Sequence, residues 1–444
     1  QAAHDRTLLA LGTVEPGTPS AAALRAELEH RREALLASNA ELVRAEPRLG
    51  VFGGLDEDAV ATARAGLPEG TVVLSYLVGS ERSLLFVATR DALHAVPIAV
   101  GRRALDRAVT TFIEAIARRE TLDRPRYRRA AERLTSDWLT PAAASLAAAE
   151  TVIVLPDGPL HRLPFAALVD PSDRQRYWVE TAASVVAPSL VALSELRSRP
   201  RPEPGARLAA FAVADPRGRG HEGSAAIATS AIRGAIRAGL DLDPLVHVDR
   251  EVAALANRFG ARTRAYVDAD ATEEAVKRLD ASTRIVHFAT HAWVDDRFPL
   301  ESGLVLTLPT HLQPGDDNGV LQAWEIVEQV RLDAELVTLS GCRTGLGRAF
   351  SGEGMLGLTR AFQLAGARAV LASLWPVNDA STSTLMTRFY DHLHQGRTSV
   401  EALRAAQLDL VTAGADGGGD LARPYHWAGF QLFGDGFSTW TTAP

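Results

Sequence analysis

Two apolar stretches decide the fold of this chain: RIVHFATHA at residues 284–292 and ELVTLSGC at residues 335–342. Both are nearly continuous runs of aliphatic and β-branched residues, the pattern of a strand that is buried on both faces of a parallel sheet. Each stretch ends in a side chain that can do chemistry, His291 in the first and Cys342 in the second. Because functional groups gather at the carboxyl ends of parallel strands, we expect these two side chains on adjacent strand ends.

Strands and helices alternate around these two stretches. The apolar patterns predict further strands at 207–215 and 367–377, and helices at 248–259, 271–280, 352–366, 382–396 and 399–414. Such alternation is typical of an α/β fold, in which a mostly parallel sheet has helices on both faces.

The first 200 residues follow a different pattern. Residues 19–46 predict a long N-terminal helix, and residues 69–98 contain three short β-branched runs split by turn signals, which indicates an antiparallel meander. Two helices and a buried strand should follow, at 102–119, 124–148 and 151–158, and a Pro-rich stretch at 199–205 marks a boundary. We therefore expect a helical segment at 1–50, one half of the protein at 51–200 and a second half at 201–444.

Composition narrows the classes of function. The 444 residues carry a net charge of −7, which argues against nucleic acid as a direct partner. No apolar run reaches the roughly 20 residues that cross a bilayer, so we expect no membrane partner. No GxxxxGK[ST] phosphate loop occurs, and we expect no cofactor. The chain begins with Gln1 rather than Met, which suggests a fragment or a processed form.

Cys342 is the only cysteine, so neither an intramolecular disulfide nor a cysteine-based metal site can form. A lone cysteine in a reducing, cytoplasmic compartment is either a small buried hydrophobe or a reactive group. Cys342 follows its apolar run rather than lying inside it, and Gly341, Arg343 and Gly345 surround it. Small neighbours let backbone N–H groups approach a substrate carbonyl, and the amide of Cys342 itself is the simplest oxyanion donor.

Two histidines lie in the first stretch. His287 is inside the apolar run and is expected to be a hydrogen-bonded core residue, whereas His291 at the exit is the better general base. His291 precedes Cys342 by 51 residues. The alternative, a zinc site built on His-x-x-x-His, would need a helix and further ligands, and we expect no metal.

Two other segments are unusual. PDGPLHRLPFAAL at 156–168 is a turn with two prolines, a histidine and an arginine. SLWPVNDAST at 373–382 ends a strand with Trp375 and Asp379 close together. Trp375 could pack in the core and Asp379 could cap the next helix, or both could line a pocket, and the residues alone leave these alternatives open.

Taken in order, PDGPLHRLPFAAL, HFATHA, LVTLSGCRTG, GEGMLGLTRAFQLAGARAVLASLWPVND and RPYHWAGFQLFGD resemble the CHAT domain over about residues 125–436. CHAT domains are bacterial relatives of caspases and separases, in the caspase-like clan of cysteine peptidases. The spacing of His291 and Cys342 is similar to that of caspases, whose histidine lies about 50 residues upstream of the cysteine. The region 20–120 also looks like the extension that follows tetratricopeptide (TPR) repeats in such proteins.

The resemblance implies a caspase-like sheet at 201–444, preceded by a degenerate caspase-like half at 51–200. It implies that Cys342 is the nucleophile, His291 the base, and the amides of Ala292 and Cys342 the oxyanion hole. Ala292 replaces the glycine that usually follows the histidine. By resemblance to separases, Asp379 would line the pocket for an arginine in the substrate, together with Ser340 and Trp375.

The sequence therefore predicts a cysteine endopeptidase that cleaves a protein or peptide partner after a basic residue, under the control of an upstream TPR-type or regulatory module. Two alternatives stay open. The chain could be an idle caspase-like scaffold that only binds partners, or a thiol hydrolase of small molecules.

Overall fold

The computed structural model describes residues 57–117, 124–199, 207–216, 242–280, 282–295, 298–309, 317–341, 353–375, 377–413 and 420–439, with a few helical residues between Thr18 and His30. Most of the predicted helix 19–46, nearly all of the linker 199–205, and Cys342 lie outside the described residues. The chain forms two compact units, Gln1–Val60 and Ala61–Pro444. The second unit is described below.

Within the described residues, eleven strands form one large sheet in the order β3-β2-β1-β4-β5-β14-β13-β12-β8-β6-β7. All neighbouring pairs are parallel except β3–β2, β2–β1 and β14–β13. The strands are β1 (Thr71–Val78), β2 (Ser83–Ala88), β3 (Leu93–Ile98), β4 (Thr151–Leu155), β5 (Ala183–Val186), β6 (Arg207–Ala212), β7 (Thr263–Val267), β8 (Thr283–Ala289), β12 (Leu336–Leu339), β13 (Ala369–Ser373) and β14 (Phe430–Gly434).

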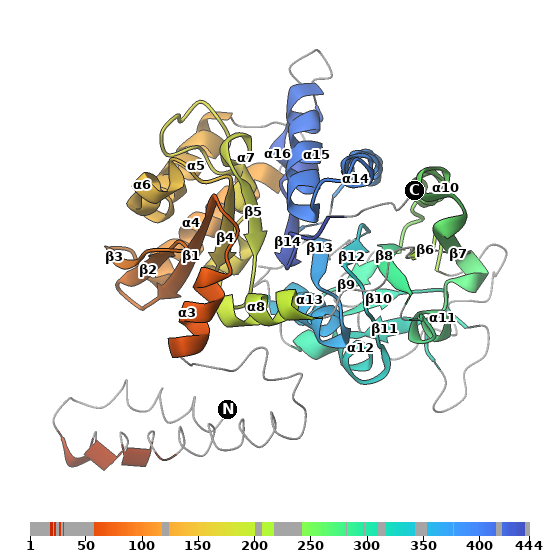
Figure 1. The fold of residues 1–444 in the computed structure, drawn as a ribbon, viewed down its shortest axis with the longest axis horizontal. Helices are drawn as coiled ribbons and strands as arrows, with labels where there is room; N and C mark the ends of the chain where they lie inside the picture. The colour runs from red at the N-terminus through yellow and green to blue at the C-terminus, as the bar shows by residue number, and fades with distance from the viewer. Residues whose placement is uncertain are drawn as a thin grey trace. The chain divides into compact units, whose positions relative to one another are not determined.

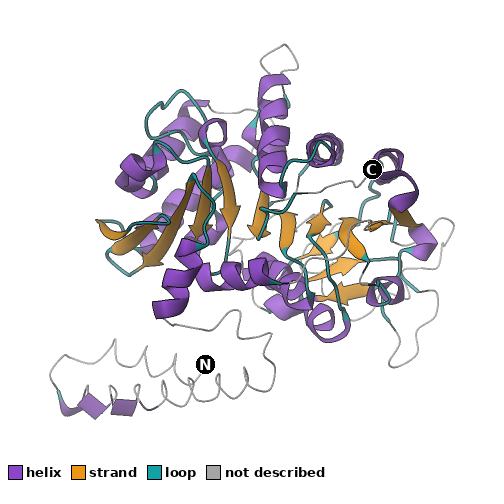
Figure 2. Cartoon of the chain, in the orientation of Figure 1, coloured by secondary structure: helices purple, strands orange, loops and turns teal. Residues whose placement is uncertain are grey.

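Helices cover both faces of this sheet (Figure 1), and Figure 2 shows the strands as the layer between them. In the view of Figure 1, α14, α15 and α16 lie above the strands, while α8, α12 and α13 lie below them. The mostly parallel α/β fold with helices on both faces is therefore confirmed. The described helices are α3 (Glu57–Ala65), α4 (Arg102–Ala117), α5 (Arg124–Trp138), α6 (Ala143–Leu146), α7 (Trp178–Thr181), α8 (Leu190–Ser198), α10 (Val248–Phe259), α11 (Glu273–Lys277), α12 (Ala323–Gln329), α13 (Glu353–Ala365), α14 (Asp379–His394), α15 (Ser399–Ala413) and α16 (Pro424–Trp427).

A second, three-stranded sheet departs from the expected pattern. Its strands β9 (Ala292–Trp293), β10 (Gly303–Val305) and β11 (Val320–Gln322) pair in the order β11-β10-β9. The predicted strand at 284–292 is confirmed as β8 up to Ala289, and the turn expected near Thr290 takes the chain out of the large sheet and into the small one at Ala292. Hydrogen bonds to β10, which the sequence pattern did not reveal, determine this change of sheet.

The predicted meander at 69–98 is confirmed as β1–β3. The predicted helix 124–148 is wrong in length, since α5 ends at Trp138 and short turns follow. Pro141 explains the stop, because proline lacks the N–H that a continuing helix needs and its ring clashes with the preceding turn. Among the described residues, no helix is both long enough and apolar enough to cross a membrane.

The two parts of the large sheet meet at β5 and β14, where Val186 pairs with Phe433. Side chains reinforce this seam: Gln431 donates to the carbonyl of Leu163 at 2.8 Å, and Arg368 donates to the carbonyl of Leu196 at 2.8 Å. Arg368 is only 1% exposed, so its guanidinium replaces water as the partner of these backbone groups. The sheet is thus continuous across the expected boundary near residue 200, and the division into halves remains a proposal.

Candidate active site

The ends of β8 and β12 lie side by side. The strands pair in parallel with Phe288 opposite Leu339, and the amide of Ser340 donates to the carbonyl of Phe288 at 2.9 Å. Beyond that bond, the backbone of Gly341 packs so closely on Thr290 that a Cβ at position 341 would lie 2.1 Å from the Thr290 oxygen. Glycine is therefore required here, and the residues just before His291 and Cys342 touch each other.

His291 is fully buried and held from two sides. Its Nε2 lies 3.0 Å from the carbonyl oxygen of Asp243, and its own carbonyl accepts the amide of Val305 at 2.8 Å. Because a carbonyl can only accept, Nε2 must carry the proton in the neutral ring, which leaves Nδ1 as the basic nitrogen. This tautomer gives the imidazole one nitrogen for orientation and one for proton transfer.

The loop 242–247 carries the carbonyl that orients His291, and it is itself anchored. The amide of Leu245 donates to the carbonyl of Ala214 at 2.8 Å, and the amide of His247 donates to Oδ2 of Asp379 at 2.9 Å. Asp379 is the first residue of α14, while the side chain of Asn378 caps the helix. The helix-capping alternative for Asp379 is therefore wrong, and Asp379 instead holds the loop that contacts His291.

His287 has the structural role that its position in the apolar run predicts. It is fully buried on β8, with Nδ1 3.0 Å from the hydroxyl of Tyr390 and Nε2 2.7 Å from Oε1 of Glu251. The Tyr390 hydroxyl also bonds Thr338 of β12 at 2.8 Å, so the network links β8, β12, α10 and α14. Burial raises the pKa of Tyr390 far above its usual value, which keeps the phenol protonated.

A pocket opens beside these strand ends. Its lining includes two of the predicted substrate-binding residues, Ser340 and Asp379, and one acid that the sequence did not reveal, Glu251 of α10. The other lining residues are Leu245, Val248, Gly341, Val377 and Thr382. Glu251 was missed because it lies about ninety residues upstream of Ser340 in an ordinary amphipathic helix, with no motif to mark it.

Trp375 packs in the core, which is one of the two alternatives that the residues left open. Its indole N–H donates to the carbonyl of Tyr425 at 3.1 Å, it is 5% exposed, and it packs against Gly429. It does not belong to the lining of the pocket that Ser340 and Asp379 share. Its assignment to the substrate pocket therefore stays a prediction without a supporting contact.

Ala292 begins β9 opposite Leu304. Since the amide of Val305 donates to the carbonyl of His291, the pair His291–Val305 is a hydrogen-bonded one. Antiparallel pairs alternate between hydrogen-bonded and non-hydrogen-bonded positions, so the N–H of Ala292 points away from β10. The predicted oxyanion role needs an amide that β10 does not occupy, and this role of Ala292 stays a prediction.

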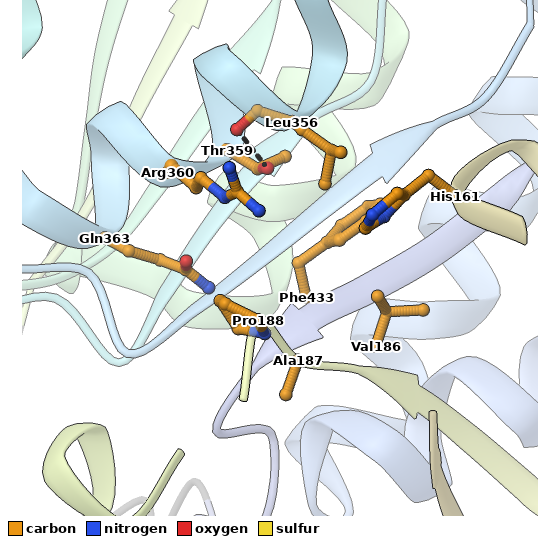
Figure 3. A pocket seen from close by; sticks show the side chains of 9 residues that line it. All are labelled: His161, Val186, Ala187, Pro188, Leu356, Thr359, Arg360, Gln363 and Phe433. Carbon is orange, nitrogen blue, oxygen red and sulfur yellow. Dashed lines mark hydrogen bonds between the residues drawn. The ribbon is translucent and has the colours of Figure 1, made fainter. Parts of the chain in front are cut away.

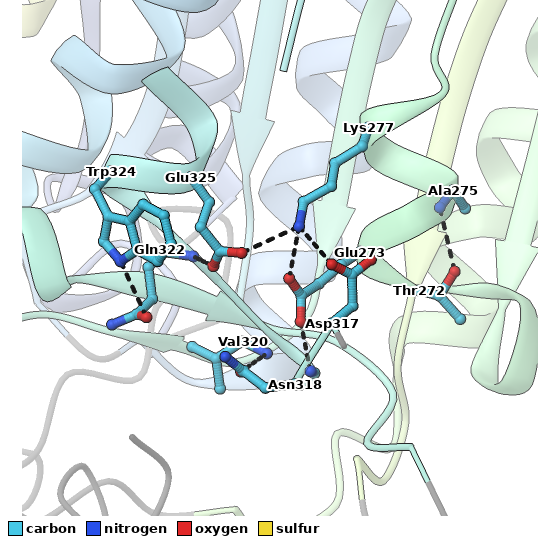
Figure 4. A network of polar contacts seen from close by, with 11 residues as sticks. Thr272, Glu273, Ala275, Lys277, Asp317, Asn318, Val320, Gln322, Trp324 and Glu325 are labelled. Atoms are coloured by element: carbon cyan, nitrogen blue, oxygen red, sulfur yellow. Dashed lines mark hydrogen bonds and ion pairs between the residues drawn. The ribbon is translucent and has the colours of Figure 1, made fainter. Parts of the chain in front are cut away.

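A buried charge network supports the small sheet from outside the pocket (Figure 4). The ammonium of Lys277 lies 3.2 Å from Glu273, 2.6 Å from Asp317 and 3.0 Å from Glu325. Glu273 also accepts the amide of Gly319, and Glu325 accepts that of Gln322, so the two carboxylates hold both ends of β11. β11 pairs with β10, which in turn bonds the backbone of His291.

The three acids Glu273, Asp317 and Glu325 form the metal-type cluster found among the described residues. Lys277 already supplies the positive charge at their centre, and neither His287 nor His291 belongs to the cluster. Burial, and next the charge of Glu325, raise the pKa of Glu273 from 4.5 to about 7. Burial acts to lower the pKa of Lys277, but the hydrogen bonds that its ammonium donates to Asp317 and Glu325 raise that pKa overall, so the lysine stays charged.

The fold is an α/β fold with a mostly parallel sheet, in which the ends of β8 and β12 lie side by side. Residues 128–435 match the CHAT domain family, and the chain belongs to that family. Over 312 residues it is 27% identical to human Tetratricopeptide repeat protein 28, a match that covers 64% of this chain and 12% of the relative. The mouse protein of the same name is 30% identical over 192 residues, covering 37% of this chain and 8% of the relative.

Among solved structures, the chain is similar to separase in the Saccharomyces cerevisiae separase-securin complex. The TM-score is 0.51 with 10% identity, over 88% of this chain and 31% of that one. At this identity the similarity concerns the fold alone. It agrees with the caspase-like architecture that the CHAT resemblance implies.

Gly341→Ala tests the close approach of the strand ends. The added methyl group would meet the Thr290 oxygen, so β8 and β12 must separate, and we expect a loss of about 1–3 kcal/mol in the free energy of unfolding. Denaturant unfolding measures this. Gly66→Ala is the matched control, because its nearest atom would be 3.6 Å away, and it should stay within about 0.5 kcal/mol. Equal stabilities of the two variants would contradict the packing described here.

Glu273→Gln tests the charge network through pH. Because the pKa of Glu273 is raised in the folded state, the native protein binds an extra proton between pH 4.5 and about 7, and this group destabilises it as the pH rises. The variant cannot bind this proton. Its free energy of unfolding, relative to that of the wild type, should therefore increase from pH 5 to pH 8. Denaturant unfolding across that range provides the measurement. The neighbouring, exposed Glu274→Gln should show no such trend, and a flat difference for Glu273→Gln would contradict the assignment.

Proposed function

We propose that this chain is a cysteine endopeptidase with Cys342 as nucleophile and His291 as general base. The observation that carries the proposal is the close contact of Gly341 with Thr290. Each of these residues directly precedes one member of the dyad in the sequence. Membership of the CHAT family and the separase-like fold support the same reading.

The chemistry follows from the orientation of His291. Nε2 donates to the carbonyl of Asp243, so Nδ1 would take the thiol proton of Cys342 as the sulfur attacks the peptide carbonyl. The N–H groups of Ala292 and Cys342 would stabilise the oxyanion. The imidazolium would then protonate the leaving amine, and water would hydrolyse the thioester with His291 again as base.

The pocket beside the dyad suggests the substrate residue. Asp379 and Glu251 bring two carboxyl groups to one lining, and Ser340 adds a hydroxyl. Glu251 is 3% exposed and Ser340 2%, so charge there is poorly screened by water. A guanidinium presents several N–H donors that suit carboxylate pairs, which favours arginine before the scissile bond.

An upstream module and the cellular compartment of the protein are also proposals. The chain spans 12% of the human relative, and that relative is named for tetratricopeptide repeats. A TPR-type module upstream of the CHAT domain would be a means of presenting a protein substrate or of controlling the peptidase. We propose a cytoplasmic protein on the ground that its single cysteine would have to stay reduced.

Peptide libraries that vary the residue before the scissile bond test the proposal. We expect kcat/KM to be about 100-fold higher for arginine than for citrulline, its neutral isostere, and Cys342→Ala should abolish all cleavage. Asp379→Asn keeps an acceptor for the amide of His247 but removes the charge, so the arginine-to-citrulline ratio should fall towards one. Glu251→Gln should lower the same ratio.

Asp249→Asn is the matched control, since Asp249 is exposed on α10 two residues from Glu251 and outside the pocket. The arginine-to-citrulline ratio of kcat/KM in Asp249→Asn should equal that of the wild type. Cleavage by the Cys342→Ala variant would contradict the proposed mechanism. A wild-type protein that binds partners but cleaves no library member would instead favour the scaffold alternative.

A further inference from the structure

The two strands that lead to the proposed dyad carry a pair of buried polar side chains. His287 of β8 lies opposite Thr338 of β12 in the parallel register, and both side chains are fully buried. His287 lies four residues before His291, and Thr338 lies four residues before Cys342. The pair therefore stands at the same short distance along the chain from each member of the dyad.

One hydroxyl group joins these two side chains. The hydroxyl oxygen of Tyr390, on α14, lies 3.0 Å from Nδ1 of His287 and 2.8 Å from Oγ1 of Thr338. Tyr390 is itself fully buried, so water does not compete for these bonds. The ring packs edge-on against Phe259 and Phe389, which holds the hydroxyl in place. We call this contact between β8 and β12 the hydroxyl bridge.

The hydroxyl bridge does not depend on where the proton of His287 lies. Nε2 of His287 is 2.7 Å from Oε1 of Glu251, a separation at which a proton must lie between the two atoms. The contact is bent, since neither atom makes an aligned hydrogen bond within the described part of the chain. If Nε2 carries the proton, Tyr390 donates to Nδ1 and accepts from Thr338. If Glu251 carries it, both bonds of Tyr390 reverse, and the phenol again uses one donor and one acceptor.

A bond of this kind resists a motion that the sheet itself permits. Neighbouring strands rotate relative to one another, by about 20–25° on average. The ladder bonds, such as the one from the amide of Ser340 to the carbonyl of Phe288, lie in the plane of the sheet. A side-chain bond that stands off one face opposes the rotation more effectively. Because β8 ends at Ala289 and β12 at Leu339, the rotation at this point sets how the residues that follow face each other.

The helix α14 contacts the surroundings of the dyad at two places. Asp379, its first residue, binds the amide of His247 in the loop that presents a carbonyl to His291. Tyr390 follows eleven residues later, which is about three helical turns, so both side chains leave the helix on the same face. One rigid helix thus holds the loop that orients His291 and the strands that lead to both members of the dyad.

Polar groups on the seam between β5 and β14 differ from this arrangement (Figure 3). His161 and Gln363 line one cavity there, and among the described residues Nδ1 of the first and Nε2 of the second have no hydrogen-bond partner. The cavity has room for about one water molecule, and that water would satisfy both atoms. Solvent is thus sufficient at the seam, whereas the groups below the dyad bond side chain to side chain and tie two strands to one helix.

We propose that Tyr390 is a positioning residue for the dyad, which joins His287 to Thr338 and so fixes the orientation of the strand ends that carry His291 and Cys342. The proposal rests on the peptidase function proposed above. Tyr390 does not line the pocket of Ser340 and Asp379, so it has no part in binding the substrate. Loss of the hydroxyl should therefore lower kcat and leave KM unchanged.

Tyr390→Phe tests the proposal, because it removes the hydroxyl and keeps the ring. The readout is the rate constant for alkylation of Cys342 by iodoacetamide at pH 6, divided by that at pH 9. A free thiol of pKa 8.5 is roughly 0.3% ionised at pH 6 and roughly 75% at pH 9, so this quotient reports the pairing of the thiol with His291. A change in the accessibility of the thiol alone alters both rates together and leaves the quotient unchanged.

We expect Tyr390→Phe to lower the quotient at least about fivefold. In peptide cleavage, kcat should fall about tenfold while KM stays within about twofold, since a small displacement of the reacting groups is costly. Thr338→Val and Thr338→Ser test the other end of the bridge. Valine keeps the branched shape without the hydroxyl and should lower the quotient at least about threefold, whereas serine keeps the hydroxyl and should leave it unchanged.

Tyr76→Phe is the matched control. Tyr76 is also buried, and its hydroxyl donates to the carbonyl of Trp138 at 2.7 Å. It lies on β1, with β4, β5, β14 and β13 between that strand and β12. This variant should lower the midpoint of thermal unfolding, because the Trp138 carbonyl loses its partner, yet leave the quotient and kcat as in the wild type.

Three results would overturn the proposal. They are an equal quotient for Tyr390→Phe and Tyr76→Phe, equal losses in Thr338→Val and Thr338→Ser, and a rise in KM at constant kcat for Tyr390→Phe. Failure of the dyad itself gives a different result. The quotient of the wild type would then match that of a free thiol and would not change in His291→Ala, which would contradict the function proposed above and the role of Tyr390 with it.

Discussion

The parallel pairing of β8 with β12 is the constraint on which the rest of the structure depends. Two fully buried strands run in register until Ser340, and the glycine at 341 then allows their ends to touch. Any larger residue at that position would force the ends apart. The chain after β8 must therefore turn away at once, and it does so by entering the small sheet at Ala292. The position of His291 follows from that turn.

Contacts to both the ring and the backbone of His291 hold this residue in place. The loop 242–247 presents a carbonyl to Nε2, Asp379 holds that loop by an amide of His247, and β10 binds the backbone of His291. The charge network at Lys277 fixes β11 against β10 from the far side. A fixed tautomer and position suit the role of general base that we propose for His291. The same residue, Asp379, thus serves the histidine and lines the pocket.

Periodicity and composition were enough to predict the alternating core of the fold. The helix 248–259, the strand ending near Leu339 and the meander at 69–98 were all predictable, because long apolar patterns with clear turn signals are local properties. The strand β9 and the place of Glu251 in the pocket could not be predicted from the sequence. The two-residue β9 exists only because β10 pairs with it, and Glu251 belongs to the pocket only because α10 packs against α14 and β8. These are long-range contacts, which a local pattern does not encode. For Trp375 the motif left core packing and a pocket role open, and the indole donates to the carbonyl of Tyr425.

The most direct test of the central claim uses the fact that Cys342 is the only thiol. The account predicts that iodoacetamide alkylates Cys342 at pH 6 at least about tenfold faster than a free thiol of pKa 8.5, even though a lower pKa also weakens the nucleophile. Removing the base in His291→Ala should abolish that advantage, whereas the exposed His94→Ala should retain it. Equal rates for the wild type and His291→Ala at pH 6 would contradict the pairing of His291 with Cys342.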